Sequence, residues 1–513
     1  MDPGRRVSVL TACGLLLLGG CDRRPLAAAE RPPDVVFVLA DTLRADRLGV
    51  YGHSGGLSPT LDAIAREGVV FERALSQAPW TQPAIASLFA SRYPGAHGVV
   101  SYRHALEGSY GGRAAVPVFD AAFVTLAEVL RAAGYSTAAF VANPFVSSAF
   151  GFAQGFDHFD SSFADNTTPG SRVNQAALAW LSQRDPERPV FLYLHYMDAH
   201  GPYDADPRFL APLLDRVDQL AARRTLAPEE LARLDYLERP PSRMRDAAQH
   251  ARLRPTLEYW IARYEAGVRE LDHHLAELRK GLESRGLWDA ALVVITSDHG
   301  EALLDQGLWD HGFSLQSVEL HVPLLLRLPA RSDGERPAGR RVPGRVRLID
   351  VMPTLLDELG LDTPKGVQGK SLVPQIGGSP PEREQRVLAE AVKWGGEQKA
   401  WYERNWKLVR RVGPPRVEQL HELASDPREQ HDRAGGEPLR RAQLADALDQ
   451  QLDRNGELAN EVTRRLRELD PAELRRLQAL GYLRGSAPAD SSSDAAPSSP
   501  SDVPDSPDRL DSP

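Results

Sequence analysis

Residues Asp34–Asp46, DVVFVLADTLRAD, give the first indication of how this chain folds. Residues 35–40 form an unbroken apolar run rich in β-branched side chains, which is typical of a strand buried on both faces of a parallel sheet. Ligands of open α/β sheets bind at the carboxyl ends of the strands, so Asp41 is well placed for chemistry. An acid directly after a strand is equally consistent with a helix cap, and this position alone does not decide between the two.

Alternating helix-like and strand-like segments follow this first strand. Pro59–Glu67 has helical periodicity and leads into a strand-like run at Val69–Ala74. Further along, Leu257–Arg285 carries apolar residues spaced by threes and fours, as in a long packed helix. The alternation predicts a doubly wound α/β domain. His273 and His274, beside the apolar stripe of the long helix, are expected at the surface.

Two later strand-like runs end in clusters of histidine and acid. Val190–Leu194 leads into HYMDAHGPY, Ala291–Ile295 leads into TSDHGE, and a WDHG segment follows. An aspartate and a histidine side by side at a strand end can both reach one divalent ion. The candidate side chains of these segments are His195, His200, Asp298, His299 and His311.

The stretch PWTQPAIASLF, residues 79–89, places a hydroxyl at the start of a helix. Thr81 stands two residues before Pro83, and proline is favoured in the first turn of a helix. Backbone N–H groups and the positive end of the helix dipole gather there, which suits an anion or a nascent alkoxide. Threonine is also a common N-cap, so both roles stay open on this stretch alone.

Composition narrows the class of protein and its partners. The chain has 513 residues, of which 42% are hydrophobic and 26% charged, as in a soluble protein with two or three domains. Its net charge of −9 offers no basic field for a polyanion, so a nucleic-acid partner is not expected.

The N-terminus is expected to be an export signal. Two arginines precede an apolar run, Val7–Leu18, that is too short to span a bilayer. The following Leu-Gly-Gly-Cys21 resembles the bacterial lipobox, in which the cysteine is lipidated; an ordinary secretory signal is the alternative. We therefore expect an exported bacterial lipoprotein, anchored to a membrane only through lipid on Cys21 and facing the periplasm or the cell exterior. The other cysteine, Cys13, lies inside the signal, so no disulfide and no cysteine nucleophile are expected.

Five motifs in a fixed order identify a family. With LADTLRAD, WTQPAIASLFASRYPGAHGV, HYMDAHGPY, TSDHGE and DVMPTLL, the chain resembles the sulfatase family of the alkaline phosphatase superfamily from about Asp34 to Asp432. The resemblance implies an alkaline-phosphatase-like α/β/α domain with a mostly parallel sheet, plus a small C-terminal antiparallel-sheet subdomain. It also implies one divalent metal ion at the strand ends, with Ca, Mn, Mg and Zn all open.

The expected organisation has six parts. They are a signal peptide at 1–20, a tether at 21–33, a catalytic α/β domain at 34–378 with a helical insertion at 204–255, an antiparallel subdomain at 379–438, a helical extension at 439–485 and a disordered Ser/Asp/Pro-rich tail at 486–513.

Carried over by position, the resemblance assigns the metal site and the nucleophile. Thr81 stands at the family's nucleophile position and is expected to contact the metal. The expected metal ligands are Asp41, Thr81, Asp298 and His299.

This chain departs from the family at several of these positions. Many members carry a Cys or Ser where Thr81 stands and oxidise it to formylglycine; a threonine would give a ketone, so no formylglycine is expected. Ile85 replaces the arginine that supports formylglycine. Thr42 stands where many members have a second ligating aspartate, and Val-Ala-Asn143 replaces a Lys-x-His segment.

The resemblance also implies a reaction. A metal-activated Thr81 alkoxide attacks phosphorus or sulfur in line and forms a covalent ester. His200 and His311 are expected to hold the ester oxygens and protonate the leaving group. The further substrate-side candidates are His97, Asn143 and His195. A purely structural role is equally open for His97, and His195 is expected to support the ligands rather than join them.

Three functions are compatible with these residues. The first is a metal-dependent hydrolase of small or envelope-derived sulfate or phosphate esters, with phosphate mono- or diesters favoured by the chemistry. The second is a phosphoryl-group transferase acting on envelope alcohols, for example with phosphoethanolamine or phosphoglycerol. The third is a ligand-binding sulfatase-like protein without catalysis.

Overall fold

The computed structural model describes residues 31–100, 115–165, 167–220, 223–235, 247–330, 337–380, 386–394, 396–460 and 465–479. The chain divides into two units, Met1–Pro32 and Pro33–Pro513, and the architecture is that of the second unit. The predicted export signal, Cys21 and the Ser/Asp/Pro-rich tail lie outside the described residues. No helix in the described ranges is long and apolar enough to cross a membrane.

A nine-stranded sheet forms the centre, in the order β10-β2-β11-β7-β1-β6-β4-β5, with β12 paired to β2. Its strands are β1 (Val35–Ala40), β2 (Val69–Leu75), β4 (Ser136–Val141), β5 (His158–Asp160), β6 (Val190–Tyr196), β7 (Leu292–Thr296), β10 (His321–Val322), β11 (Leu324–Arg327) and β12 (Arg340–Arg347). Strands β7, β1, β6, β4 and β5 run parallel, whereas β11 is antiparallel to β7 and β2. The predicted α/β class with a mostly parallel sheet is therefore confirmed.

Strand β1 lies in the interior of this sheet, and its position accounts for its continuous apolar sequence. It pairs with β6 on one side and β7 on the other, and all six of its residues are buried. A strand covered on both faces has no solvent-facing side, so it shows no polar alternation. The polar residues begin at the strand ends, where the chain leaves the sheet.

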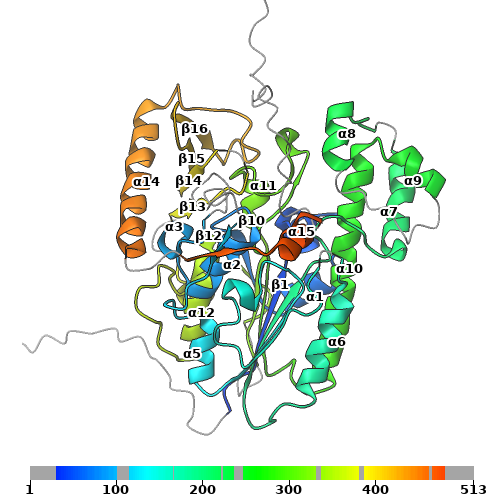
Figure 1. The fold of residues 1–513 in the computed structure, drawn as a ribbon, viewed down its shortest axis with the longest axis vertical. Coiled ribbons are helices and arrows are strands. Elements are labelled where there is room, and N and C mark those ends of the chain that lie inside the picture. Colours follow the sequence, from blue (N-terminus) through cyan, green and yellow to red (C-terminus); the bar gives the residue numbers. More distant parts are fainter. Residues whose placement is uncertain are drawn as a thin grey trace, which may run out of the picture. The chain divides into compact units, whose positions relative to one another are not determined.

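Helices cover both faces of the sheet, so the layers are α/β/α (Figure 1). One face carries α1 (Pro59–Arg66), α6 (Gly170–Leu181) and α10 (Leu257–Glu283), and the other carries α2 (Thr81–Ala90), α5 (Leu126–Ala132) and α12 (Val351–Glu358). The side chain of Thr256 accepts a hydrogen bond from Tyr259 N and caps α10. The long helix predicted from the apolar stripe is thus present.

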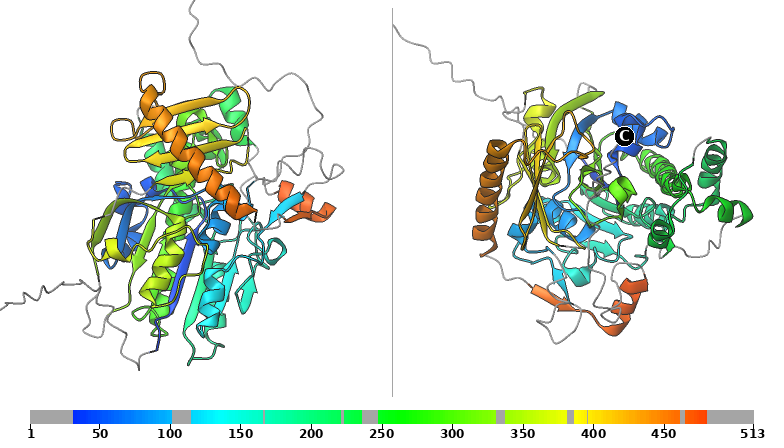
Figure 2. Two further views of the ribbon diagram at one scale, coloured as in Figure 1. Left: turned by 90° about the vertical axis from the view of Figure 1, so that its left-hand side faces the viewer. Right: turned by 90° about the horizontal axis from the view of Figure 1, so that it is seen from above.

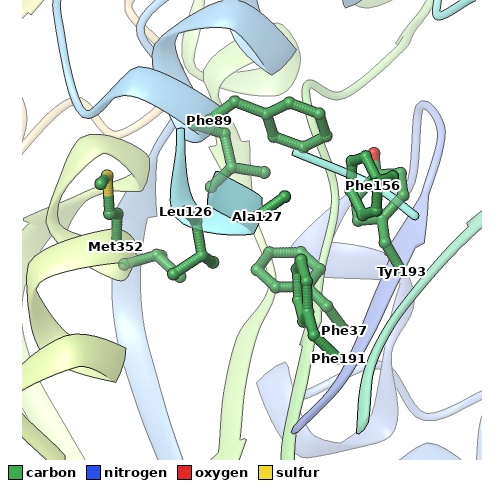
Figure 3. A pocket seen from close by; sticks show the side chains of 10 residues that line it. Phe37, Phe89, Leu126, Ala127, Phe156, Phe191, Tyr193 and Met352 are labelled. Atoms are coloured by element: carbon green, nitrogen blue, oxygen red, sulfur yellow. The ribbon is translucent and has the colours of Figure 1, made fainter. Parts of the chain in front are cut away.

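A small cavity lies inside the layer between the sheet and α2, α5 and α12 (Figure 3). Aromatic and aliphatic side chains line it, among them Phe37, Leu126, Phe156, Phe191 and Met352. Tyr193 is the one polar side chain among the ten residues that line it, so the cavity is a packing feature of the core.

The predicted helical insertion contains three helices in the part of the chain that is described. They are α7 (Pro207–Gln219), α8 (Pro228–Asp235) and α9 (Ala247–Leu253). Helix α7 packs against α10, so the insertion extends the helical layer on that face of the sheet.

The C-terminal part forms a four-stranded antiparallel sheet in the order β13-β14-β15-β16. Its strands are β13 (Val387–Ala389), β14 (Gln398–Glu403), β15 (Trp406–Arg411) and β16 (Val417–Glu422). Helix α14 (Pro438–Ala459) packs on β14 and β15 (Figure 2). The small antiparallel subdomain implied by the family resemblance is confirmed.

The helical extension predicted at 439–485 also contains a strand. After α14, the chain forms strand β17 (Arg465–Glu468), followed by α15 (Pro471–Ala479). Strand β17 pairs antiparallel with β3 (Ala115–Val118), more than 300 residues earlier in the chain. A four-residue strand whose partner is so distant leaves no periodicity that distinguishes it from a helical turn.

Candidate active site

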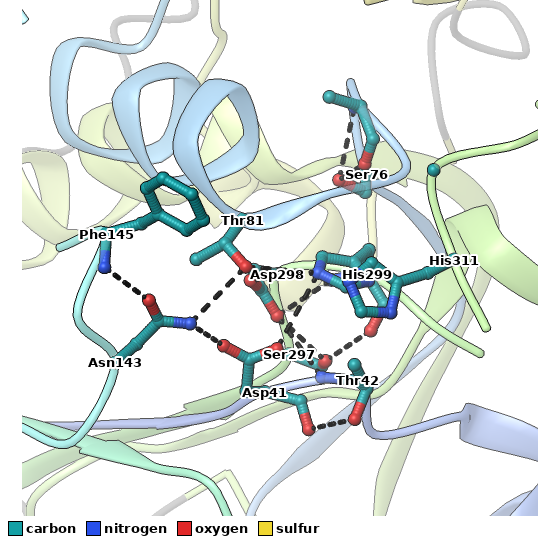
Figure 4. Close-up of polar contacts among 12 residues, drawn as sticks. Asp41, Thr42, Ser76, Thr81, Asn143, Phe145, Ser297, Asp298, His299 and His311 are labelled. Carbon is teal, nitrogen blue, oxygen red and sulfur yellow. Dashed lines mark hydrogen bonds and ion pairs between the residues drawn. The ribbon is translucent and has the colours of Figure 1, made fainter. Parts of the chain in front are cut away.

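Neighbouring strand ends bring the predicted metal ligands together (Figure 4). Asp41 follows β1, and Asp298 and His299 follow β7, the parallel neighbour of β1. One ligand atom from each residue lies within 4.8 Å of the others. His299 Nε2 is 3.6 Å from Asp41 Oδ1 and 3.3 Å from Asp298 Oδ2. All three residues are buried.

Hydrogen bonds fix one oxygen of Asp41 and leave the other for a ligand. Oδ2 accepts from Asn143 Nδ2 at 2.7 Å and from His195 Nε2 at 3.0 Å. Oδ1 is buried and has no hydrogen-bond partner. His195 thus supports the carboxylate from behind.

Asp298 and His299 are oriented in the same way. Asp298 Oδ1 accepts from His299 N at 3.0 Å and from Thr42 N at 3.4 Å, whereas Oδ2 is buried without a hydrogen-bond partner. His299 Nδ1 donates to Gly300 O at 2.9 Å, so the neutral ring presents the lone pair of Nε2 to the cluster.

The residues present fit a divalent cation. Two partnerless carboxylate oxygens and an imidazole nitrogen converge in a buried space, and these are ligand types for Zn²⁺ and Mn²⁺. Burial and the nearby Asp41 charge raise the pKa of Asp298 well above its usual value. For Asp41, burial would raise the pKa, but the His195 hydrogen bond and the surrounding imidazoles lower it. A bound cation would balance both carboxylates.

Thr81 directs its hydroxyl at this cluster. It is the first residue of α2, it is 1% exposed, and its Oγ1 lies 3.4 Å from His299 Nε2 and 3.5 Å from Asn143 Nδ2. The N-cap is Trp80, and no side chain caps the helix. The alternative role of Thr81 as an N-cap is therefore wrong.

His200 and His311 stand together beside His299. The centroid of the His311 ring lies 4.4 Å from that of His299 and 5.2 Å from that of His200. His311 Nδ1 is 2.9 Å from Asp310 Oδ1 and 3.1 Å from Glu301 Oε1; burial opposes its charge, but these two carboxylates raise its pKa well above the usual value. Burial lowers the pKa of His200. One imidazolium and one neutral imidazole thus face the same space.

His97 takes no part in these contacts. It is the last residue of α3 (Pro94–His97), the short helix that follows α2. Its Nε2 is 2.9 Å from Ser87 Oγ, and its Nδ1 accepts from Val99 N at 3.2 Å. Burial lowers the pKa of His97 to about 3, so the ring is neutral. Its contacts hold the chain after α2 against that helix.

Lys393 is a charged neighbour of the site that sequence reasoning missed. It lies in the loop after β13, is 4% exposed, and its Nζ stands 5.6 Å from the ring centroids of both Trp80 and Phe145. Its backbone N donates to Gly312 O at 2.8 Å, next to His311. Only folding of the C-terminal sheet against the main domain brings this ammonium to Trp80 and Phe145, and no local pattern signals it.

Two family models match this chain. A model described as "Sulfatase" matches residues 33–361, more than half of the chain, and one described as "N-sulphoglucosamine sulphohydrolase, C-terminal" matches residues 305–457. The chain belongs to the sulfatase family. As a family member it is a hydrolase acting on ester bonds of the sulfate and phosphate type.

Individual relatives are distant but extensive. An N-acetylglucosamine-6-O-sulfatase of Bacteroides thetaiotaomicron is 21% identical over 505 residues, covering 83% of this chain and 86% of that protein. A solved structure in complex with its substrate D-glucosamine-2-N,6-O-disulfate has a TM-score of 0.66 at 19% identity, covering 84% of this chain and 99% of that one. The phosphonate monoester hydrolase of Agrobacterium radiobacter has a TM-score of 0.64 at 22% identity, covering 82% and 96%. The two structures show the shared fold.

Within this sulfatase-family site, two of the departures have clear structural consequences. Ile85 is fully buried in the main hydrophobic core. Thr42 places its hydroxyl within hydrogen-bond distance of two backbone carbonyl oxygens, Asp41 O at 2.7 Å and Ala199 O at 3.0 Å. Its φ of 57° lies in the left-handed region, which a β-branched residue rarely adopts. The strained backbone lets Thr42 N reach Asp298, so the residue orients a carboxylate rather than supplying one.

Proposed function

We propose that this sulfatase-family protein hydrolyses phosphate or sulfate esters with Thr81 as its nucleophile, and that phosphate mono- or diesters are its preferred substrates. One observation carries the proposal. Three ligand-type atoms converge beside the Thr81 hydroxyl. They are the carboxylate oxygens of Asp41 and Asp298 that lack a hydrogen-bond partner, and the unprotonated Nε2 of His299. A divalent ion held there supplies positive charge that lowers the pKa of a nearby hydroxyl and stabilises charge on ester oxygens.

The surrounding residues suit both halves of the reaction. As Thr81 Oγ1 releases its proton to solvent and bonds to phosphorus, the bond from phosphorus to the leaving alkoxide breaks, and protonated His311 donates its proton to that alkoxide. In the second half, water attacks phosphorus and neutral His200 accepts its proton. The bond from phosphorus to Thr81 Oγ1 then breaks, the Thr81 oxygen takes this proton from His200, and His311 regains a proton from solvent. Asn143 Nδ2 and the start of α2 donate hydrogen bonds to the ester oxygens.

Lys393 adds a positive charge over the ring of Trp80, the residue before Thr81. Its ammonium stands among the rings of Trp80, Phe145 and Trp394, where it attracts the anionic part of a substrate. A phosphate ester carries at least as much negative charge as a sulfate ester, and the simple ester formed by a threonine is released by a second in-line attack. These two points favour phosphate.

The test uses the chain without residues 1–21 and a panel of aryl phosphate, aryl phosphodiester and aryl sulfate substrates. We expect Thr81→Ala to lower kcat/KM by on the order of 10³-fold or more, and Thr81→Ser to retain part of the activity. Thr363→Ala, at an exposed position, is the matched control. Activity of Thr81→Ala within a few-fold of the unmutated protein on every substrate would overturn the proposal.

A further inference from the structure

A second cluster of ligand-type side chains lies outside the proposed active site. One ligand atom each from Asp198, Glu270 and His274 lies within 4.8 Å of the others. Asp198 belongs to the loop after β6, whereas Glu270 and His274 stand four residues apart on α10. Residues at this spacing share one face of a helix, as metal-binding pairs on helices do.

The cluster is buried, contrary to the expectation that His274 lies at the surface. The side chains of Asp198 and His274 are 1% and 3% exposed, and Glu270 is 7% exposed. The expectation failed because helical periodicity places His274 at the edge of the apolar stripe, and only the approach of the β6 loop covers it.

One carboxylate oxygen in the cluster has no hydrogen-bond partner. Asp198 Oδ1 accepts from Gly170 N at 3.0 Å and from His274 Nδ1 at 2.9 Å, and Glu270 Oε2 accepts from Asp206 N at 3.1 Å. Asp198 Oδ2 is buried and receives no hydrogen bond. A buried carboxylate oxygen without a donor is the same feature that marks Asp41 and Asp298.

The charges within the cluster do not balance by themselves. Its described hydrogen bonds come from two backbone N–H groups and one imidazole. Two carboxylates therefore face at most one positive charge, and buried charges are normally paired or bound to metal. Once His274 Nδ1 gives up the proton that it shares with Asp198 Oδ1, two carboxylate oxygens and one imidazole nitrogen form a donor set that suits Zn²⁺ or Mn²⁺.

We propose that Asp198, Glu270 and His274 bind a second divalent cation, which fastens the loop carrying His200 to α10. The loop packs directly on α10 at Gly267. The contact is so close that a Cβ atom at this position would stand 2.1 Å from Asp198 O. Two residues after Asp198 comes His200, and Ala199 O accepts the Thr42 hydroxyl. An ion at this point thus holds the segment that positions His200.

The experiment counts bound metal in protein that is stripped with a chelator and dialysed against Zn²⁺ or, in a parallel arm, Mn²⁺. We expect two ions per chain in the unmutated protein. Asp198→Asn, His274→Gln and Asp41→Asn should each bind one ion, and Asp41→Asn combined with Asp198→Asn should bind none. His273→Gln, at the half-exposed neighbouring position, is the matched control and should bind two.

The outcomes separate this site from the catalytic one. If the unmutated protein binds one ion and Asp41→Asn loses it, the second site does not exist and Asp198, Glu270 and His274 form only a hydrogen-bonded network. Retention of both ions by Asp198→Asn and His274→Gln also overturns the proposal. If Asp41→Asn keeps an ion that the double variant loses, the second site stands even where the assignment of Thr81 fails. Should a variant fail to fold, a count of one ion on the unmutated protein still overturns the proposal.

Discussion

His195 shows how single residues prepare the site. Its Nε2–H donates to Asp41 Oδ2, while Tyr193 OH donates to its Nδ1 at 3.3 Å, so the ring is held in one tautomer. We expect His195→Gln to weaken divalent-ion affinity at the Asp41 site about 10- to 100-fold, because residues that orient ligands affect metal binding on this scale. Metal titration by calorimetry of the Asp198→Asn background isolates the Asp41 site. An affinity equal to that of a His273→Gln control would contradict this role.

Glu319 predicts a pH dependence of stability. It is fully buried, its Oε2 accepts from Gly312 N at 2.6 Å, and burial raises its pKa from 4.5 to about 8. The protonated form favours the folded state, so its stabilisation is complete below 4.5 and is lost as pH rises through about 8. Glu319→Gln cannot titrate. The Tm of this variant minus that of the unmutated protein should therefore increase between about pH 5 and about pH 9. A pH-independent difference would show that Glu319 is ionised throughout.

At the scale of elements, the loop after β13 brings residues of the C-terminal part into contact with Trp80, the residue before Thr81. Trp80 Nε1 donates to Ala391 O at 2.6 Å, and Lys393 stands over the Trp80 ring. We expect Lys393→Met to raise KM roughly 10- to 100-fold with a much smaller change in kcat, since a hydrogen bond to a charged group is lost. Steady-state kinetics against Lys365→Met, an exposed position, measure this effect. An unchanged KM would remove Lys393 from substrate binding.

The parallel core, and the meeting of Asp41, Asp298 and His299 at its edge, could be predicted because their signals are local. A strand buried on both faces is a continuous apolar run, and the polar residue that follows it marks the reactive edge of the sheet. Strand β17, His274 and Lys393 could not be predicted, since each owes its place to a partner far away in the sequence: β3, the β6 loop and Trp80, respectively. Non-local contacts of this kind leave no trace in periodicity.

At the scale of the whole molecule, the two sheets share a hydrophobic cluster. Leu75, Leu315 and Leu320 of the main domain pack with Val387 and Tyr402 of the C-terminal sheet. The buried ion pair of Lys407 and Glu429 lies beside it, with Lys407 Nζ donating to Glu429 Oε2 at 2.6 Å. Separating the sheets would expose apolar surface on both.

We therefore expect thermal unfolding in a single transition, monitored by circular dichroism and by tryptophan fluorescence. Trp406 lies in the C-terminal sheet and Trp260 in α10, so fluorescence reports on both parts of the molecule. Two resolved transitions, or midpoints that differ between the two probes, would show that the C-terminal sheet unfolds independently.

The export signal and the lipid on Cys21 stay predictions, because these residues lie outside the described ranges.

The central claim is that Thr81 attacks the ester. The most direct measurement is peptide mass mapping after rapid acid quenching of the protein during turnover of an aryl phosphate or aryl sulfate. The account predicts one added phosphoryl or sulfuryl group on the peptide containing Thr81, and no adduct in Thr81→Ala. An adduct on another residue, or steady turnover by Thr81→Ala at the rate of the unmutated protein, would contradict it.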